Sequence, residues 1–171
     1  MKRWLVLVAA LCATCVMSFA QNYSDDAVSH KFEASIGGRL ANGDGGLMSY
    51  QTIKTGFRFT PDWSVRAGYS SGTGKYWDTD IMHKSDIVDL GIAKAFRSDR
   101  MKNVETLITF GAGYMWDKSS GTVSSKVLGM VDFESRLYTS KNGYIGVSFN
   151  AYAGKNFVQS SWLGVSWGIR F

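Results

Sequence analysis

His83 and Ser85 are two residues of this chain whose types and spacing could carry out catalysis. A serine becomes a nucleophile when a base takes its proton, and an acidic group usually orients that base. The alternating pattern around the two residues puts both side chains on the same side as Asp89, which is the polar side. A polar edge of a loop explains the pair better than a hydrolase site does.

Other kinds of functional site find little support in the sequence. Both cysteines, Cys12 and Cys15, lie within the first twenty residues, and the chain has two histidines, so we expect no transition-metal site. His30 is interpreted as an interfacial residue rather than a ligand. The sequence holds no glycine-rich nucleotide loop and no zinc-protease motif, so no cofactor is expected. A formal net charge of +5 without a block of Lys and Arg does not indicate a nucleic-acid partner.

Residues 1–20 have the pattern of a secretory signal peptide. Two basic residues precede an apolar run that ends near Met17, and the small-x-small sequence Ser18-Phe19-Ala20 follows. The apolar run is too short to cross a bilayer as a helix. We therefore expect cleavage after Ala20, which leaves residues 21–171 as one exported domain without cysteine.

Eight segments of residues 21–171 alternate between apolar and polar side chains, which is the period of a β-strand. The predicted strands are residues 28–40, 47–60, 63–70, 84–97, 104–116, 125–138, 144–152 and 161–171. The connections after the second, fourth and sixth segments are short turns, whereas the others are predicted as longer loops rich in Gly, Ser or Asp. Tyr76 and Trp77 fall in the longest of these loops, residues 71–83, where exposed aromatic residues are weak evidence of binding.

The two faces of these segments differ in a way that indicates which one is outside. The polar face carries both signs of charge beside many Gly and Ser, and the apolar face carries one full charge, Lys94. A soluble barrel is wet outside and favours long polar residues there, whereas a narrow eight-stranded lumen needs small side chains between large ones. The sequence therefore predicts an all-β fold, an eight-stranded antiparallel up-and-down transmembrane β-barrel.

Two groups of residues follow from this orientation. Mixed charges in a narrow lumen can pair and plug it, and the predicted lumenal charge network is Glu33, Lys54, Arg58, Arg66, Asp89, Glu105, Asp132, Glu134 and Arg136. The same charges could instead line an ion path, so a small-solute pore stays an alternative. Aromatic residues near the strand ends of the apolar face form the predicted girdle, which is Phe59, Trp63, Phe96, Tyr114 and Trp116.

The signal peptide, the eight alternating segments and the terminal aromatic resemble small bacterial outer-membrane β-barrels of the OmpX and OmpA-transmembrane-domain type. The resemblance implies a place in the cell outer membrane with both termini periplasmic. It implies outer-membrane lipids and the barrel-assembly machinery as partners, and it leaves the partner of the surface loops unknown. The residues that match the family's C-terminal assembly signal are Leu163, Val165, Trp167, Ile169 and Phe171.

Some barrels of this kind are lipid A deacylases that use a His-x-Ser pair and a glutamate. Here no glutamate follows Ser85 until Glu105, and the pair faces the lumen while a lipid substrate lies outside. The prediction is therefore a protein without enzymatic activity, in a structural or cell-surface interaction role. A lipid A- or phospholipid-modifying enzyme stays the alternative beside the pore.

Overall fold

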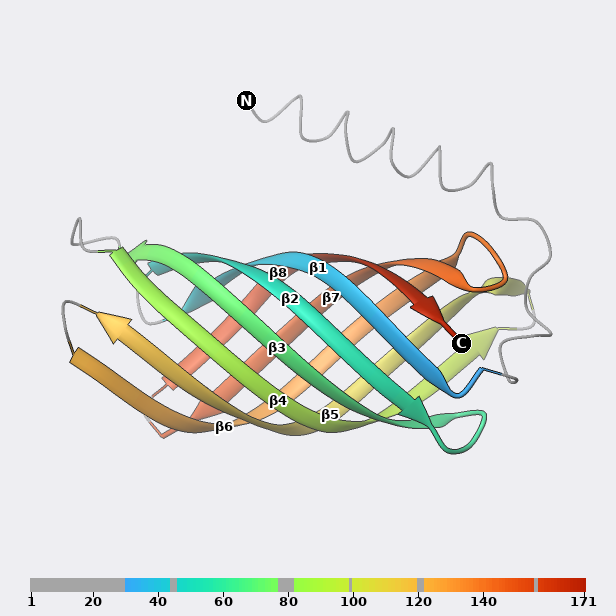
Figure 1. The fold of residues 1–171 in the computed structure, drawn as a ribbon, viewed down its shortest axis with the longest axis horizontal. Coiled ribbons are helices and arrows are strands. Elements are labelled where there is room, and N and C mark those ends of the chain that lie inside the picture. The colour runs from blue at the N-terminus through green and yellow to red at the C-terminus, as the bar shows by residue number, and fades with distance from the viewer. Residues whose placement is uncertain (1–29, 44–45, 77–81, 99, 120–121, 156) are drawn as a thin grey trace, which may run out of the picture.

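Eight strands form a closed antiparallel barrel in the computed structural model of the chain (Figure 1). The structure describes residues 30–43, 46–76, 82–98, 100–119, 122–155 and 157–171. The strands are β1 Phe32–Gly43, β2 Gly46–Arg58, β3 Trp63–Tyr76, β4 Met82–Ser98, β5 Met101–Ser119, β6 Thr122–Tyr138, β7 Gly143–Gly154 and β8 Phe157–Arg170. This confirms the predicted fold class. The predicted signal peptide, residues 1–20, lies outside the described residues.

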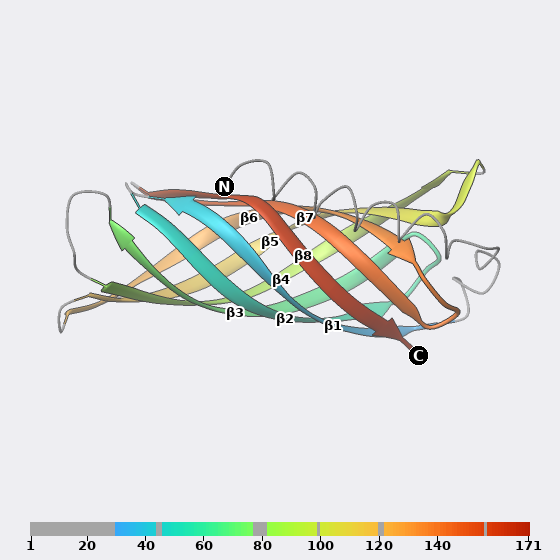
Figure 2. The ribbon, with the colours of Figure 1, turned by 90° about the horizontal axis from the view of Figure 1, so that it is seen from above.

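Each strand pairs with its neighbours in the chain, and β1 also pairs with β8, so the ring is complete. All strands run obliquely to the barrel axis (Figure 2). Closure gives the backbone groups of every strand a partner on both sides, which a chain needs when it crosses lipid. We call the end where β1 starts and β8 stops the terminal end, and the end with the β1–β2, β3–β4 and β5–β6 connections the loop end. In the part of the chain that the structure describes, no helix is long and apolar enough to cross a membrane.

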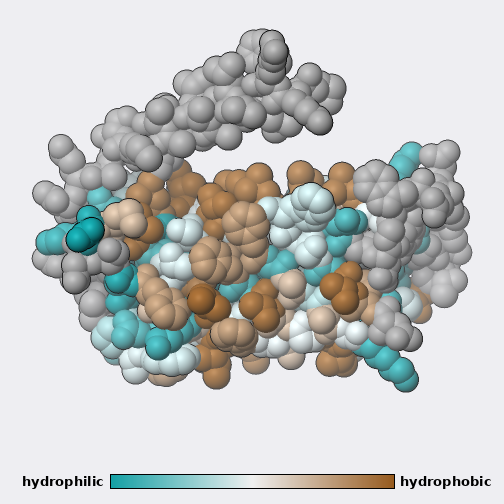
Figure 3. All heavy atoms as spheres, turned by 180° about the vertical axis from the view of Figure 1, so that it is seen from behind, coloured by the Kyte–Doolittle hydropathy of each residue, from teal (hydrophilic) through white to brown (hydrophobic). Residues whose placement is uncertain are grey.

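The barrel is apolar outside and polar inside, as the alternation predicts. Ile36, Leu90, Ile92 and Phe110 are each more than half exposed, because their side chains stand on the outer surface. Hydrophobic side chains cover the middle of the barrel, and hydrophilic ones gather toward its ends (Figure 3). Polar residues on the alternate positions, such as Arg66, are buried in the lumen. The orientation is therefore that of a transmembrane barrel and not of a soluble ligand-binding one.

The strands at the loop end are longer than the sequence predicts. Residues 71–76 continue β3 and residues 82–83 begin β4, so the predicted loop 71–83 is wrong for these residues, and residues 77–81 lie outside the described part of the chain. The predicted loops 41–46 and 117–124 are wrong in the same way for residues 41–43, 46, 117–119 and 122–124, which belong to strands, and residues 44–45 and 120–121 lie outside the described residues. Gly72 shows why glycine misleads here, because a Cβ at this position would overlap the ring of Tyr50 inside the barrel. Gly72 therefore makes room for a lumenal side chain rather than ending a strand.

A β-bulge in β8 changes the side on which one residue lies. Leu163 pairs with Leu40, and the next pair along β1 joins Ala41 to Ser161, so Trp162 is an extra residue in β8. Trp162 and Leu163 both point outward as a result, and Trp162 is 66% exposed. Strict alternation puts Trp162 in the lumen, and the bulge overturns that prediction.

Candidate functional site in the barrel lumen

Four charged side chains on β1, β3 and β6 meet in the terminal-end half of the lumen and form the central group of its charges. Arg136 donates two hydrogen bonds to the carboxylate of Glu33, at 2.6 and 2.8 Å, and its Nε lies 3.3 Å from Oε1 of Glu134. Arg66 forms ion pairs with the same two carboxylates, at 3.3 Å to Glu33 and 2.7 Å to Glu134. Ser166 on β8 donates a further hydrogen bond to Glu134. Each buried carboxylate thus contacts two guanidinium groups, which compensates its loss of hydration.

A second group of charges lies nearer the terminal end, around Glu105 on β5. Arg58 donates two hydrogen bonds to the two oxygens of Glu105, each 3.0 Å long, and Tyr138 donates one of 2.6 Å. Arg97 adds an ion pair of 2.6 Å from the rim of the barrel. Arg136 lies 3.8 Å from Glu105, so it joins this group to the central one.

Lys54 on β2 and Asp132 on β6 complete the network on the other side of the centre. Their ion pair is 2.7 Å long, and Arg66 lies 3.7 Å from the same carboxylate. One continuous set of contacts therefore links six strands, β1 to β6, across the lumen. The residues of the predicted network that belong to it are Glu33, Lys54, Arg58, Arg66, Glu105, Asp132, Glu134 and Arg136.

Asp89 lies in a separate contact group. Its carboxylate accepts a hydrogen bond of 2.8 Å from the Tyr152 hydroxyl, which in turn accepts one of 3.2 Å from Arg39. The Arg39 guanidinium also lies over the rings of Tyr50 and Tyr152, at 4.6 and 4.9 Å from their centroids. Sequence reasoning put Asp89 in the charge network and left these tyrosines out. Their positions on the lumenal side of alternating strands were the signal that could have found them.

The loop-end half of the lumen is filled mainly by apolar and aromatic side chains. This cluster consists of Ala41, Tyr50, Ile87, Met115, Leu128, Met130, Tyr152 and Phe157, with Met48 packed against it. Sequence reasoning missed it, because an inward residue such as Met115 lies between the outward aromatic residues Tyr114 and Trp116, which blurs the alternation. The described lumen therefore has two layers, one of ion pairs and one of apolar packing.

His83 and Ser85 point into the lumen near the loop end. Nδ1 of His83 lies 3.9 Å from Oδ1 of Asp117, and Ser85 is paired with Asp117 in the β4–β5 register. Ser85 is 2% exposed, and among the described residues its hydroxyl has no hydrogen-bond partner. A serine nucleophile needs its base within hydrogen-bond reach and a path to its substrate. The geometry thus leaves Ser85 without an activating base and away from the lipid-facing surface.

The predicted girdle residues lie at both ends of the apolar belt. Trp63 and Phe96 are outward at the terminal end, where the Lys94 ammonium lies 5.5 and 5.4 Å from their ring centroids. Phe59 is exposed in the adjacent turn. Tyr114 and Trp116 form an edge-to-face pair, with centroids 4.8 Å apart, toward the loop end. Lys94 is the outward charge that the alternation predicts on the apolar face, and its side chain extends over these rings toward the rim of the barrel.

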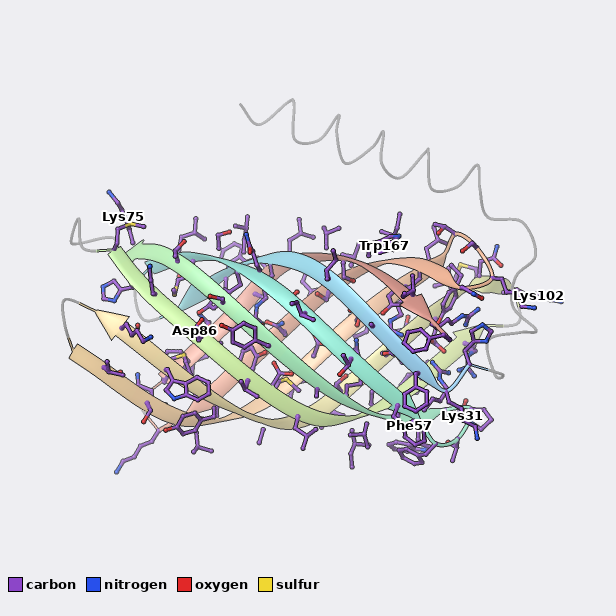
Figure 4. All side chains as sticks on the ribbon, viewed as in Figure 1. Lys31, Phe57, Lys75, Asp86, Lys102 and Trp167 are labelled. Carbon is purple, nitrogen blue, oxygen red and sulfur yellow. The ribbon has the colours of Figure 1, made fainter. Side chains whose placement is uncertain are left out.

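The C-terminal residues lie where β8 closes the ring. The backbones of Phe171 and Phe32 exchange two hydrogen bonds of 2.9 Å, and their rings stack with centroids 6.3 Å apart. The outer surface of β8 carries the other residues of the predicted assembly signal, which are Leu163, Val165, Trp167 and Ile169. Trp167 points away from the barrel (Figure 4).

The remaining predictions concern His30, Tyr76, Trp77 and metal binding. His30 hydrogen-bonds through Nε2 to Asn142 at 2.9 Å at the terminal end. Tyr76 ends β3 rather than lying in a loop, and Trp77 lies outside the described residues. Among the residues described, no group of three or more His, Cys, Asp or Glu side chains is arranged to hold a metal ion.

The solved structures with this architecture include small outer-membrane barrels. The Neisserial surface protein A has a TM-score of 0.70 and 12% identity, over 82% of this chain and 97% of that one. Ail, the attachment invasion locus protein of Yersinia pestis, has a TM-score of 0.56 and 19% identity, over 83% and 99%. The outer membrane enzyme PagL has a TM-score of 0.50 and 13% identity, over 81% and 99%. No protein-family model and no curated protein matches the sequence.

The closed ring, the apolar exterior and the ion-paired lumen define a transmembrane β-barrel of eight strands. In particular, the fold is that of the small bacterial outer-membrane barrels, as the resemblance of the sequence predicts. This fold carries both surface proteins and an enzyme, so it does not by itself decide the activity.

Proposed function

We propose that this protein is an integral outer-membrane barrel with a plugged lumen, which acts in a structural or cell-surface interaction role. The observation that carries the proposal is the filled lumen, where ion pairs on six strands lie next to an apolar layer. Ion-paired side chains occupy one layer, and the apolar side chains of the other layer interrupt a polar path along the lumen. The similar folds of a Neisserial surface protein and of the Ail attachment protein support a role at the cell surface.

We expect the purified barrel to be silent in planar-bilayer conductance recordings, because the ion pairs and the apolar cluster both obstruct the lumen. A general porin reconstituted in the same lipid serves as the positive control, and insertion is verified by heat-modifiable migration on gels. Discrete conductance steps from the unmodified protein would instead support the small-solute pore.

Phe171 and the outward residues before it are proposed as the signal for assembly in the outer membrane. We expect Phe171→Ala to remove most of the heat-modifiable protein from the outer-membrane fraction of cells, whereas Phe171→Trp keeps it. Refolding of both variants from urea into detergent should proceed, because the ring packing against Phe32 is one contact among many. If Phe171→Ala assembles in cells as well as the unmodified protein does, Phe171 is not a signal.

A further inference from the structure

The outer surface of β4 and β5 changes in chemistry toward the loop end. Outward positions of β5 run from Phe110 through Ala112 to Tyr114 and Trp116, and end at Lys118. On β4 the corresponding order is Leu90, Val88, Asp86 and Lys84. Aromatic residues of membrane proteins mark the level of the headgroups. Because a strand rises about 3.3 Å per residue and is tilted by about 40°, Lys118 lies roughly 5 Å beyond Trp116 along the membrane normal.

Lys84 and Lys118 are directly opposite each other in the β4–β5 ladder. Opposite residues have Cβ atoms about 5 Å apart, and like charges in this position destabilise a sheet. Both lysines are exposed on the outer surface, and among the described residues neither ammonium group has a partner. Thr73 on β3 pairs with Lys84 in the same row and is also exposed. The row thus presents two cations and a hydroxyl side by side.

Asp86 is the carboxylate nearest to this row on the same face of β4. Its Oδ1 accepts a hydrogen bond of 3.0 Å from the Tyr69 hydroxyl on β3, and it makes no ion pair with Lys84 or Lys118. Asp86 lies in the loop-end half of the barrel (Figure 4). The repulsion between the two lysines is therefore not relieved by a described carboxylate, and an anion from the surroundings would relieve it.

We propose that Lys84 and Lys118 form a clamp for the phosphate of a membrane lipid headgroup in the leaflet at the loop end. Two adjacent ammonium groups match the charge of a phosphomonoester, and the Thr73 hydroxyl can donate to one of its oxygens. The depth of the pair, just beyond Tyr114 and Trp116, is the depth of lipid phosphates. The clamp rests on the proposed membrane location and assigns a lipid partner to one patch of the barrel.

Lys94 provides the matched contrast on the same strand and the same outer surface. Its ammonium lies over the rings of Trp63 and Phe96 at the terminal end, so aromatic faces already surround it. Its cross-strand partners are Trp63 and Ile108, so no second cation faces it. Lys94 therefore has the charge but not the geometry of the clamp.

The test uses the full exported barrel in mixed micelles of a nonionic detergent and phosphatidylcholine, to which phosphatidic acid is added, with bound lipid counted by native mass spectrometry. We expect the double variant Lys84→Gln, Lys118→Gln to bind phosphatidic acid at least about tenfold more weakly than the unmodified protein, because each basic residue contributes several-fold to the affinity for anionic lipid. Lys94→Gln should change binding less than about twofold. An excess of inorganic phosphate should not displace the lipid, since the acyl chains lie along the adjoining apolar belt.

Equal binding by the double variant and the unmodified protein would overturn the clamp. An equal loss of lipid binding in Lys94→Gln would also overturn it, because the lipid would then be attracted to any positive charge on the barrel. Heat-modifiable migration of every variant is measured in parallel. Failure of the unmodified protein to give a heat-modifiable form would contradict the membrane barrel itself, whereas normal migration with unchanged lipid binding contradicts only the clamp.

Discussion

Arg136→Met will lower the free energy of unfolding by about 3 kcal/mol, because it leaves two buried carboxylates short of a partner. Glu33 and Glu134 both contact the Arg136 guanidinium, and the Arg136 side chain itself is fully buried. Arg66 still reaches both carboxylates, which holds the effect at the lower end of the range for broken buried pairs. Urea-induced unfolding in phosphatidylcholine vesicles, followed by tryptophan fluorescence, measures the change.

Arg97→Met is the control for this experiment. Arg97 is partly exposed at the rim, and Glu105 keeps Arg58 and Tyr138 when Arg97 is lost, so the expected cost is below about 1 kcal/mol. Adding Glu33→Gln to Arg136→Met should recover part of the lost stability, since it removes one of the two carboxylate charges that are short of a partner. A change for Arg136→Met no larger than that for Arg97→Met would mean that the central ion pairs do not stabilise the barrel.

Leu90→Arg is expected to cost about 2–4 kcal/mol in the same vesicles, because it places a charge in the middle of the lipid-facing belt. Leu90 is 59% exposed on the outer surface of β4, with Ala67 and Ala112 as its cross-strand neighbours. These small neighbours leave space for the side chain, so the cost comes from lipid contact and not from overpacking.

Val158→Arg is the matched control, because it places the same side chain on the outer surface at a different depth in the membrane. Val158 is also outward and exposed, but it lies near the loop end of β8, so the expected cost is about 0–1 kcal/mol. Equal costs for the two variants would contradict a lipid-facing belt centred on Leu90. The unmodified chain fits the same rule, since Lys94 is outward and lies at the rim.

The side of the barrel on which a residue lies could be predicted from the sequence, because it depends on a period of two. Arg66, Asp132 and Arg136 are lumenal for this reason. Their partners could not be predicted, since a contact across the lumen depends on the stagger of all the strands between them. The pair of Lys54 with Asp132 joins strands that are not neighbours in the ring.

Local irregularities account for the other differences. One extra residue in β8 turned Trp162 outward, and the Ser161 and Gly164 that flank the bulge do not mark it, since the same residue types recur throughout the strands. Glycines such as Gly72 resemble loop residues, but their role is visible only once Tyr50 is seen to lie against them. The apolar layer of the lumen was not predicted, because inward Met115 is as apolar as its outward neighbours Tyr114 and Trp116.

The pairing of β1 with β8 also has a kinetic consequence. It joins residues from the two extremes of the folded domain, as in Phe32 with Phe171, so the last contact to form carries a large loop-closure entropy. Until that contact forms, the sheet has two open edges with unpaired amide and carbonyl groups, which are prone to join another chain. Nascent chains that lack the final strand should therefore aggregate rather than wait as soluble intermediates.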